Sequence, residues 1–414
     1  MCYRNLLLVF LACGFLGTQG HADDIVWPGW LGRNRDGWVA DFQPPTLWPE
    51  KLQQVWQVDV GEGYGTPLLT NQRVYQHARQ GGEEVLWCLD RNSGEVIWRK
   101  EYNVAFKMGG GGEKHGKGPK SNPIIAQGRV FTLSITGVLR AFDAQTGNLI
   151  WQRDDTAQFG KNHPYWGVST SPIVDGDRII VHFGNDKTGV LIALNTATGE
   201  QVWTHGKDGP DYSSPLVATL HGVRQVIEWN QRVITGIEIE TGKKLWEHLL
   251  PHVGRNQNMP TPAIHDGHIL VGAENRGFFS FYPQPKAGTW SVQEKWHQEK
   301  VALNMSSAVI NDGKLFGFSH YDSGRIFCLN PQTGDVLWKG PGRVGENVAF
   351  LSLPGHIAAL TNSGELQVIK AVDAGYEKVA SYRVSDNQTW AAPVLFNGGL
   401  LIKDKSNLTM WSLK

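Results

Sequence analysis

The sequence predicts an all-β protein, an eight-bladed β-propeller built from four-stranded antiparallel blades. Three observations lead to this prediction: a hairpin motif recurs along the chain, a second motif opens an inner strand before each hairpin, and each end of the array supplies part of one further blade. A period of about 40–50 residues is typical of folds that repeat one supersecondary unit. We expect three segments, a signal peptide at residues 1–22, an N-terminal extension at 23–50 and the propeller at 51–414.

The hairpin motif places an Asp, Asn or Glu four residues before a glycine, and that glycine four residues before a tryptophan. The clearest copies are residues 86–98, 139–151 and 191–203. The acidic or amide side chain can cap a tight turn, and glycine tolerates the positive φ that such a turn requires. The turn glycines are Gly94, Gly147, Gly199, Gly242 and Gly334.

An aromatic residue closes the outer strand of each repeat, at intervals of 42 to 53 residues. We expect each of these rings to pack between neighbouring sheets, where truncation typically costs about 3–5 kcal/mol. The closing residues are Trp56, Trp98, Trp151, Trp203, Trp246, Trp296, Trp338 and Tyr382. Seven complete blades fit between the first and the last of them.

The second motif is a small or polar residue followed by proline, which opens each inner strand. Its copies end at Pro67, Pro123, Pro172, Pro215, Pro262 and Pro393. The last repeat, residues 390–413, has inner strands but no closing tryptophan, whereas the strand around Trp56 has no blade before it. We predict that this N-terminal strand completes the eighth blade, because a closed ring leaves no open sheet edges.

The N-terminus carries a short basic region, an apolar stretch too short to span a bilayer and a small-residue cleavage site. This pattern predicts a signal peptide cut near Ala22 and export to the periplasm or the medium, without a transmembrane segment. Acylation at Cys13 is the lipoprotein alternative. Lys plus Arg and Asp plus Glu are balanced at 39 each, which argues against a nucleic-acid partner. We expect a monomer.

The Asp/Asn-x-x-Thr-Gly-x-x-x-Trp hairpins resemble the quinoprotein-dehydrogenase-like propeller superfamily, which includes the quinoprotein alcohol dehydrogenases. Residues 27–37, 166–172, 212–215 and 222–225 are similar to a bacterial family of exported pyrroloquinoline-quinone-like repeat proteins. Members of that family are often labelled by analogy with the propeller subunit of the outer-membrane β-barrel assembly machinery. The resemblance implies the fold across nearly the whole mature chain, but a propeller hosts many functions.

The same resemblance raises the question of bound pyrroloquinoline quinone and calcium. Dehydrogenases of the superfamily carry two adjacent cysteines over the quinone, and no Cys-Cys pair exists here. Cys88 and Cys328 instead occupy the hairpin position at which other copies have Ala141, Ala193 or Gly236. We therefore expect two buried structural cysteines, too far apart to form a disulfide, and no cofactor, with the quinone and calcium as the alternative.

Two local patterns imitate ligand sites. The stretch 108–119 contains Gly-x-x-x-x-Gly-Lys, but glycine stands where a phosphate-binding loop needs Ser or Thr and no helix follows. We expect a mobile loop at the propeller mouth. The pairs His265/His268 and His248/His252 have spacings found at metal sites. The first brackets a turn and proline interrupts the second, so we expect no metal.

The connections that enter the inner strands converge on one end of a propeller channel, and they hold the most unusual residues of this chain. They predict a binding pocket at that mouth whose aromatic faces stack on a sugar or planar ring. Solvated loops without a pocket are the plain alternative. The candidate binding residues are His115, Lys120, His163, Trp166, Asp211, Tyr212, Asn258, Asn304 and Trp390.

No catalytic motif accompanies these residues, and the eight blades use almost the whole length. The sequence therefore favours a non-catalytic, exported binding scaffold that recognises a protein or a glycan at its loop face. Two alternatives stay open. One is an oxidoreductase that uses pyrroloquinoline quinone and calcium, and the other is a carbohydrate-active enzyme with carboxylates such as Asp211 or Glu346.

Overall fold

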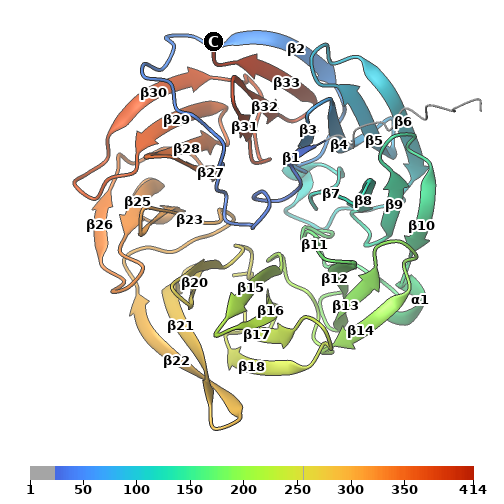
Figure 1. Cartoon of the computed structure of the whole chain (residues 1–414), viewed down its shortest axis with the longest axis vertical. Coiled ribbons are helices and arrows are strands. Elements are labelled where there is room, and N and C mark those ends of the chain that lie inside the picture. The colour runs from blue at the N-terminus through green and yellow to red at the C-terminus, as the bar shows by residue number, and fades with distance from the viewer. Residues whose placement is uncertain (1–23, 255) are drawn as a thin grey trace, which may run out of the picture.

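The computed structural model describes residues 24–254 and 256–414, so the predicted signal peptide lies outside the described residues. The chain forms a ring of eight antiparallel sheets around a central channel, which confirms the predicted eight-bladed propeller (Figure 1). In the described residues, helix is limited to α1 (Thr156–Phe159) and two 3-10 turns, η1 (Glu113–His115) and η2 (Tyr321–Ser323). No helix in this part of the chain is long and apolar enough to span a membrane.

In blades one to seven the four strands run from the channel outward in chain order, whereas in blade eight the outermost strand comes from the start of the chain. Blades one to four contain β3 (Leu68–Thr70), β4 (Arg73–Gln80), β5 (Glu83–Asp90) and β6 (Val96–Asn103); β7 (Ile124–Ala126), β8 (Arg129–Leu133), β9 (Leu139–Asp143) and β10 (Leu149–Arg153); β11 (Ile173–Asp175), β12 (Arg178–Gly184), β13 (Gly189–Asn195) and β14 (Gln201–His205); β15 (Leu216–Leu220), β16 (Val223–Trp229), β17 (Val233–Glu238) and β18 (Lys244–Leu249).

Blades five to eight continue the same pattern. They contain β19 (Ala263–His265), β20 (His268–Ala273), β21 (Gly277–Lys286) and β22 (Thr289–Gln298); β23 (Val309–Asn311), β24 (Lys314–Ser319), β25 (Arg325–Leu329) and β26 (Val336–Lys339); β27 (Val348–Leu353), β28 (His356–Thr361), β29 (Glu365–Lys370) and β30 (Lys378–Arg383); β31 (Val394–Phe396), β32 (Gly399–Lys403), β33 (Asn407–Ser412) and β2 (Gln53–Asp59).

Burial explains why the middle strands are continuously apolar and the outer strands alternate. β12 and β13 are covered by sheets on both faces, and nearly all their side chains are buried. The outermost β6 has one face toward solvent and alternates between exposed and half-buried positions. Period-two alternation is expected only where one face of a strand is solvated.

The eighth blade closes the ring as the sequence predicts. β2, from the start of the chain, pairs antiparallel with β33, from its end, in a register that runs from Gln53 opposite Ser412 to Asp59 opposite Asn407. In Figure 1 the two strands lie side by side at the top of the ring. This pairing removes the free edge that β33 would otherwise expose.

The closing tryptophans join each blade to the next. A Cβ added at Gly94 would lie 2.7 Å from the ring of Trp56, so the absence of a side chain lets the indole cover the turn. The same contact joins Gly147 to Trp98, Gly199 to Trp151, Gly242 to Trp203 and Gly334 to Trp296. Each of these turn glycines has a φ between 69° and 79°, as the motif predicts.

Trp246 departs from this pattern. Its indole Nε1 donates to Gln225 Oε1 of its own blade at 2.7 Å, and a Cβ at Gly236 would collide with the indole. The physical reason lies in the next blade, whose β21 and β22 each extend to ten residues and form a long hairpin instead of the short motif turn (Figure 1). That blade offers no motif glycine for Trp246 to cover.

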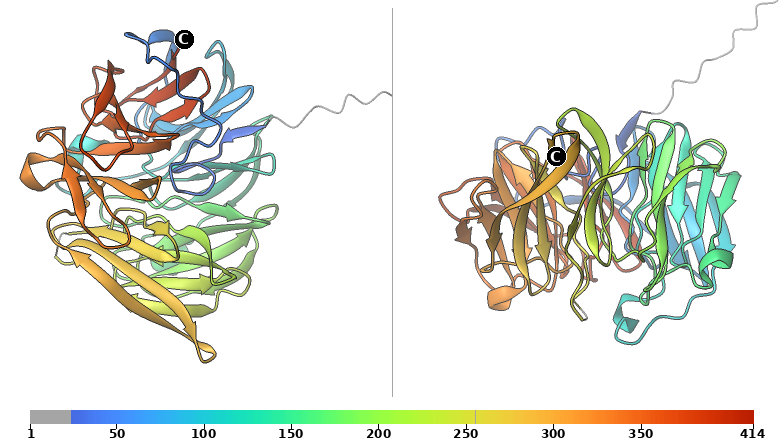
Figure 2. Two further views of the ribbon diagram at one scale, coloured as in Figure 1. Left: turned by 60° about the vertical axis from the view of Figure 1, so that its left-hand side comes forward. Right: turned by 90° about the horizontal axis from the view of Figure 1, so that it is seen from below.

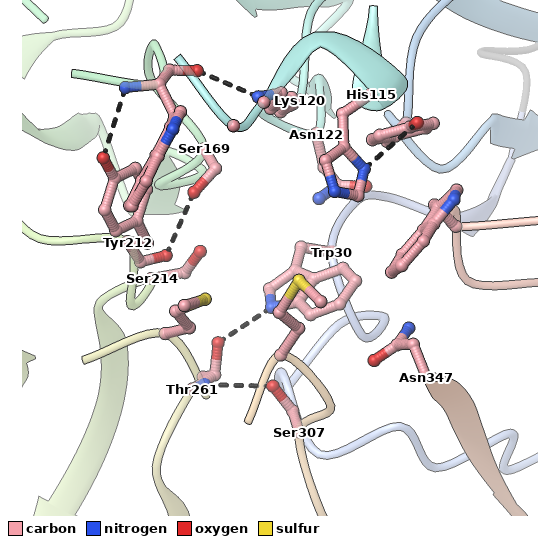
Figure 3. Close-up of a pocket in the computed structure, with 17 residues that line it drawn as sticks. Trp30, His115, Lys120, Asn122, Ser169, Tyr212, Ser214, Thr261, Ser307 and Asn347 are labelled. Carbon is pink, nitrogen blue, oxygen red and sulfur yellow. Dashed lines mark hydrogen bonds between the residues drawn. The ribbon is translucent and has the colours of Figure 1, made fainter. Parts of the chain in front are cut away.

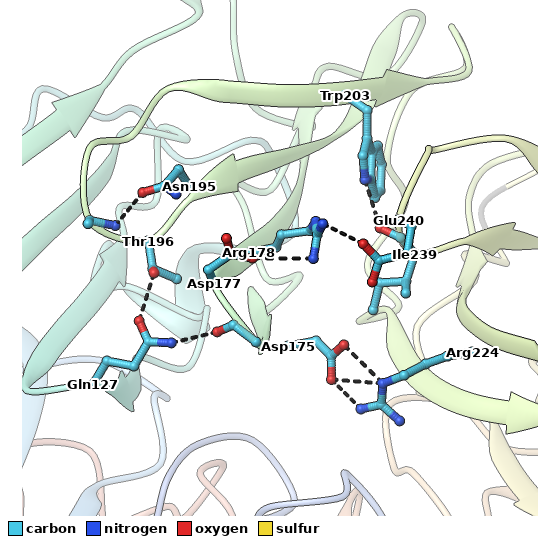
Figure 4. Close-up of polar contacts among 12 residues, drawn as sticks. Gln127, Asp175, Asp177, Arg178, Asn195, Thr196, Trp203, Arg224, Ile239 and Glu240 are labelled. Atoms are coloured by element: carbon cyan, nitrogen blue, oxygen red, sulfur yellow. Dashed lines mark hydrogen bonds and ion pairs between the residues drawn. The ribbon is translucent and has the colours of Figure 1, made fainter.

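Polar contacts add to the joints between blades two, three and four (Figure 4). Gln127 donates to Gly176 O at 2.6 Å and accepts from Thr196 Oγ1 at 2.8 Å. Arg224 donates from Nε to Asp175 at 2.9 Å across the next joint. Such exposed ion pairs contribute about 0–1 kcal/mol each, so the apolar packing dominates the joints.

A ring of hydrogen bonds runs around the channel at the residues before the prolines. The Thr66 N–H donates to Asn122 Oδ1 at 2.6 Å, and the Asn122 N–H donates to Ser171 Oγ at 3.0 Å. The Ser171 N–H donates to Ser214 Oγ at 2.9 Å, one blade further on. The second motif therefore satisfies the inner-edge backbone of one blade with a side chain from the next.

The N-terminal extension is part of the fold and fills the channel, which the sequence does not predict. β1 (Ile25–Trp27) adds a fifth strand to blade one by pairing with β3. The Ser352 N–H of blade seven donates to Gly37 O, and the Gln43 N–H donates to Asn397 Oδ1 of blade eight. In Figures 1 and 2 this segment crosses the centre of the ring as a dark blue loop.

Arg35 anchors this plug, which we define as residues 25–43. Its guanidinium is buried and donates to the carbonyl oxygens of Ser171, Pro172 and Pro215 from blades three and four. No carboxylate of the described chain pairs with it, and burial lowers the pKa of Arg35 to about 9. The plug therefore ties blades three and four to one buried cation from the start of the chain.

The two cysteines lie where the motif places them. Cys88 is opposite Trp98 across the hairpin of blade one, and Cys328 is opposite Trp338 in blade six. Their side chains belong to different core clusters, as expected for non-adjacent blades. Burial raises the pKa of Cys328 to about 12, so that thiol is a poor nucleophile at neutral pH.

Candidate functional site

A cavity of about 310 Å³ lies at the channel mouth, on the side of the loops that enter the inner strands (Figure 3). Trp30 of the plug forms its floor, and the eight connections that enter the inner strands form its wall. The cavity is lined by Trp30, Tyr64, Gly111, Gly112, His115, Lys120, Asn122, Trp166, Ser169, Tyr212, Ser214, Met259, Thr261, Met305, Ser307, Asn347 and Trp390.

Five aromatic rings from distant parts of the chain surround this cavity. Trp30 comes from the plug, and its Nε1 donates to Thr261 Oγ1 at 2.9 Å. The rings of Trp166 and Tyr212 lie 6.0 Å apart on one side. Tyr64 and Trp390 lie 5.9 Å apart and complete the set. The walls can therefore offer apolar faces to a planar group.

The glycine-rich loop, residues 108–119, covers one side of the mouth. The Gly110 N–H donates to Tyr165 Oη at 2.9 Å, and Gly110 O accepts from Trp166 Nε1 at 3.3 Å. Further along, Lys114 Nζ pairs with Glu346 Oε2 at 2.9 Å, although both side chains are more than half exposed. In the side view of Figure 2 the loop projects below the ring. Weak, solvated contacts thus hold the loop over the cavity.

Lys120 is the cation of the cavity wall. Its Nζ donates to Trp166 O at 2.9 Å and lies 4.0 Å from Met108 Sδ. No carboxylate among the described residues pairs with it, and burial lowers its pKa to about 8. Lys120 is therefore largely protonated at pH 7, yet poorly compensated.

His115 faces the same cavity as a neutral imidazole. Its ring lies 4.7 Å from the Trp390 ring, and its Nδ1 is 3.4 Å from Tyr64 Oη. Burial, together with the charges of Lys120 and Lys114, lowers the pKa of His115 to about 4. His115 therefore adds no charge to this site at neutral pH.

The structure brings five of the predicted residues to the cavity: His115, Lys120, Trp166, Tyr212 and Trp390. The other four, His163, Asp211, Asn258 and Asn304, do not belong to its lining. Each lies in a predicted connection but serves the packing of the loops.

Asp211 and Asn258 show why. Asp211 Oδ2 accepts from the Asn258 N–H at 2.8 Å and from His252 Nδ1 at 3.1 Å, so this carboxylate is buried behind the wall. Asn258 Nδ2 donates to Asn230 O at 2.8 Å. Burial raises the pKa of Asp211 despite these hydrogen bonds.

His163 and Asn304 are also drawn into the loops. His163 Nδ1 lies 2.8 Å from Pro164 O, and its ring packs edge-on against Phe106. Asn304 Oδ1 is buried without a hydrogen-bond partner in the described chain. The carboxylates considered for carbohydrate chemistry do not face each other either, because Asp211 is behind the wall and Glu346 is bonded to Lys114 on the rim.

The histidines of the two predicted pairs contact neighbouring side chains. In residues 24–254 and 256–414, no group of three His, Cys, Asp or Glu side chains is arranged to bind a metal ion. His268 Nδ1 bonds to Ser280 Oγ at 2.9 Å, and His265 pairs with Asp266.

Sequence reasoning missed Trp30, the two methionines and the small hydroxyl residues of the cavity. Ser214 and Thr261 belong to the residue-proline motif, which recurs in six of the eight blades at the start of the inner strand. That periodicity was a usable signal. Trp30 has no such signal, because it reaches the cavity through the plug.

Comparison with known proteins identifies relatives along most of the chain. A family model described as "Outer membrane protein assembly factor BamB" matches residues 35–205 and 82–340. The protein of that name from Yersinia pestis is 24% identical over 372 residues, which covers 85% of this chain and 86% of the relative.

Solved structures agree on the fold. BamB from Moraxella catarrhalis superposes with a TM-score of 0.62 at 15% identity and covers 87% of this chain and 97% of its own. A quinohemoprotein alcohol dehydrogenase from Comamonas testosteroni reaches 0.67 at 12% identity, with 94% and 80% covered. At such identities the likeness shows the propeller architecture alone.

Proposed function

We propose, from the premise that this chain belongs to the family described as outer membrane protein assembly factor BamB, that it is an exported, non-catalytic scaffold that binds a protein partner during outer-membrane protein assembly. The observation that carries the proposal is the extent of the match. The alignment with the Yersinia pestis assembly factor covers 85% of this chain and 86% of that protein. The similarity therefore extends over most of the propeller and is not confined to one motif.

The surface of the loop face supports a protein partner. Leu249, the last residue of β18, is 64% exposed, and Val253, on the connection that follows to blade five, is 56% exposed. Tyr165 is half exposed on the connection between blades two and three. Exposed apolar side chains on the connections of a rigid ring suit contact with a protein partner. We place the partner on this sector of the loop face.

Site-specific photo-crosslinking in cells tests this placement. A photoreactive residue at Leu249 or Val253 should give a discrete adduct with a component required for outer-membrane protein assembly. Val96 and Ile97, on the outermost strand of blade one, are similarly apolar and 48% and 45% exposed, so they are the matched control positions. Adducts that form only from the control positions would contradict the proposed face.

The proposal includes no cofactor and a single chain per functional unit. After incubation with pyrroloquinoline quinone and calcium, purified protein should lose the quinone chromophore on a desalting column. Stoichiometric retention with dye reduction would instead establish an oxidoreductase.

Export with cleavage near Ala22 predicts a mature N-terminus at Asp23, which N-terminal sequencing reads directly.

A further inference from the structure

We infer that the channel-mouth cavity binds a small organic carboxylate that carries an aromatic ring. This inference goes beyond the proposed scaffold role, which concerns protein contacts on the loop surface and does not use the cavity. It follows from the charge, the hydrogen-bond donors and the shape of the wall.

The charge of the wall is one-sided. Lys120 is the charged side chain in the lining at neutral pH, and no Asp or Glu contributes to the lining. Its other contacts, Trp166 O and Met108 Sδ, carry no formal charge. A partly buried cation without a counter-ion is a complement for an anion, since attraction is stronger where water is partly excluded. One cation favours one carboxylate over a polyanion.

The polar groups of the wall offer donors without partners. Ser214 Oγ accepts the Ser171 N–H, and Ser307 Oγ accepts the Thr261 N–H, both near 3 Å. Neither hydroxyl proton has an acceptor within the described chain. Asn347 Oδ1 accepts from Ser306 at 2.7 Å, which likewise leaves the Asn347 amide protons available. Carboxylate oxygens accept several hydrogen bonds and fit such a donor-rich wall.

The aromatic rings define the rest of the ligand. Trp30 lies across the floor (Figure 3). Trp166 and Trp390 also line the cavity, from the connection between blades two and three and the connection between blades seven and eight. Aromatic faces prefer offset or edge contacts with another ring. The volume of about 310 Å³ is at the lower end of the range of about 300–1,000 Å³ for small-molecule pockets, which suits a compact ligand with one or two rings.

The glycine-rich loop gives the ligand a route. Its contacts to Tyr165 and Glu346 are exposed, and a Cβ at Gly111 would meet no atom within 4 Å. Opening this loop exposes the cavity without breaking a blade. Closing it brings His115 over the ligand as a neutral imidazole, which adds a polar contact and no charge.

The test is a matched pair of probes, phenylacetate and phenylacetamide, titrated into the purified mature chain at pH 7 by calorimetry and ligand-observed NMR. The probes have the same shape and differ in charge. We expect the carboxylate to bind at least tenfold more tightly than the amide. Equal affinities, or no binding of either probe, would overturn the inference, and this comparison needs no variant.

Variants then locate the site. Lys120→Met should bring the affinities of the two probes within about threefold of each other, and Trp390→Ala should weaken both probes at least tenfold. Lys243→Met removes an exposed lysine of the blade-four turn and should leave both affinities unchanged. Unchanged discrimination in folded Lys120→Met protein would place the anion elsewhere. Because these are binding readouts on the purified chain, their failure leaves the crosslinking test of the scaffold role intact.

Discussion

Truncating Trp56 tests the physical basis of ring closure. Trp56 lies in β2, the strand that completes the eighth blade, and its indole covers Gly94 of blade one. The side chain is only 7% exposed, and Nε1 donates to Arg91 O at 2.8 Å. Trp56→Ala therefore weakens the contact between the last blade and the first.

The expected loss follows from two contributions. A large-to-small change at a buried tryptophan costs about 3–5 kcal/mol. The lost hydrogen bond adds about 1 kcal/mol, because Arg91 O lies near the rim and water can replace the indole. A total of about 4–6 kcal/mol is a large share of the usual stability of about 5–15 kcal/mol.

The assay is urea unfolding followed by far-ultraviolet circular dichroism, with Trp38→Ala as control. Trp38 is the same residue type but 36% exposed, so its loss should cost less than about 1 kcal/mol of unfolding free energy. Deleting residues 23–57 removes both β2 and the plug and should abolish cooperative unfolding. If Trp56→Ala unfolded within about 1 kcal/mol of the wild type, the ring would not depend on this joint.

Three further predictions follow from single residues. Gly94→Ala should destabilise the protein by about 2 kcal/mol more than Gly82→Ala in the same unfolding assay, because both glycines have positive φ but only Gly94 faces the Trp56 ring. Burial lowers the pKa of Lys403 from 10.5 to about 8, so holding its charge in the folded state costs free energy at neutral pH. Lys403→Met should therefore raise the unfolding free energy by about 1–3 kcal/mol at pH 7, and this gain should shrink as the pH rises above about 8 and vanish near pH 10.5. Phenylacetate affinity should fall as the pH rises through about 8, where Lys120 loses its proton, while phenylacetamide affinity stays constant in the same titrations.

The fold was predictable because its causes are local and repeated. The spacing from turn glycine to tryptophan fixes a hairpin at each of its five copies, and the eight regularly spaced closing aromatic residues set the number of blades without any knowledge of distant contacts. Trp246 shows the limit of this reasoning. Its indole adopts a different partner because the following blade replaces the motif turn with the long β21–β22 hairpin.

The plug was not predictable because its contacts are non-local. The Arg35 guanidinium donates hydrogen bonds to three backbone carbonyl oxygens, and no side-chain pattern in the sequence identifies those acceptors. The pocket was predictable in part. Topology brings Trp166 and Trp390 to one mouth, but a sequence does not show that Asp211 and Asn258 turn inward to bond with each other.

The most direct test of the scaffold role is the amount of folded outer-membrane β-barrel protein in cells that lack this chain. We predict a lower amount, restored by the wild type and by Lys120→Met but not by the Leu249→Ser/Val253→Ser double variant. The Val96→Ser/Ile97→Ser double variant is the matched control and should restore it. An unchanged amount of folded outer-membrane protein in the deletion strain would contradict the account.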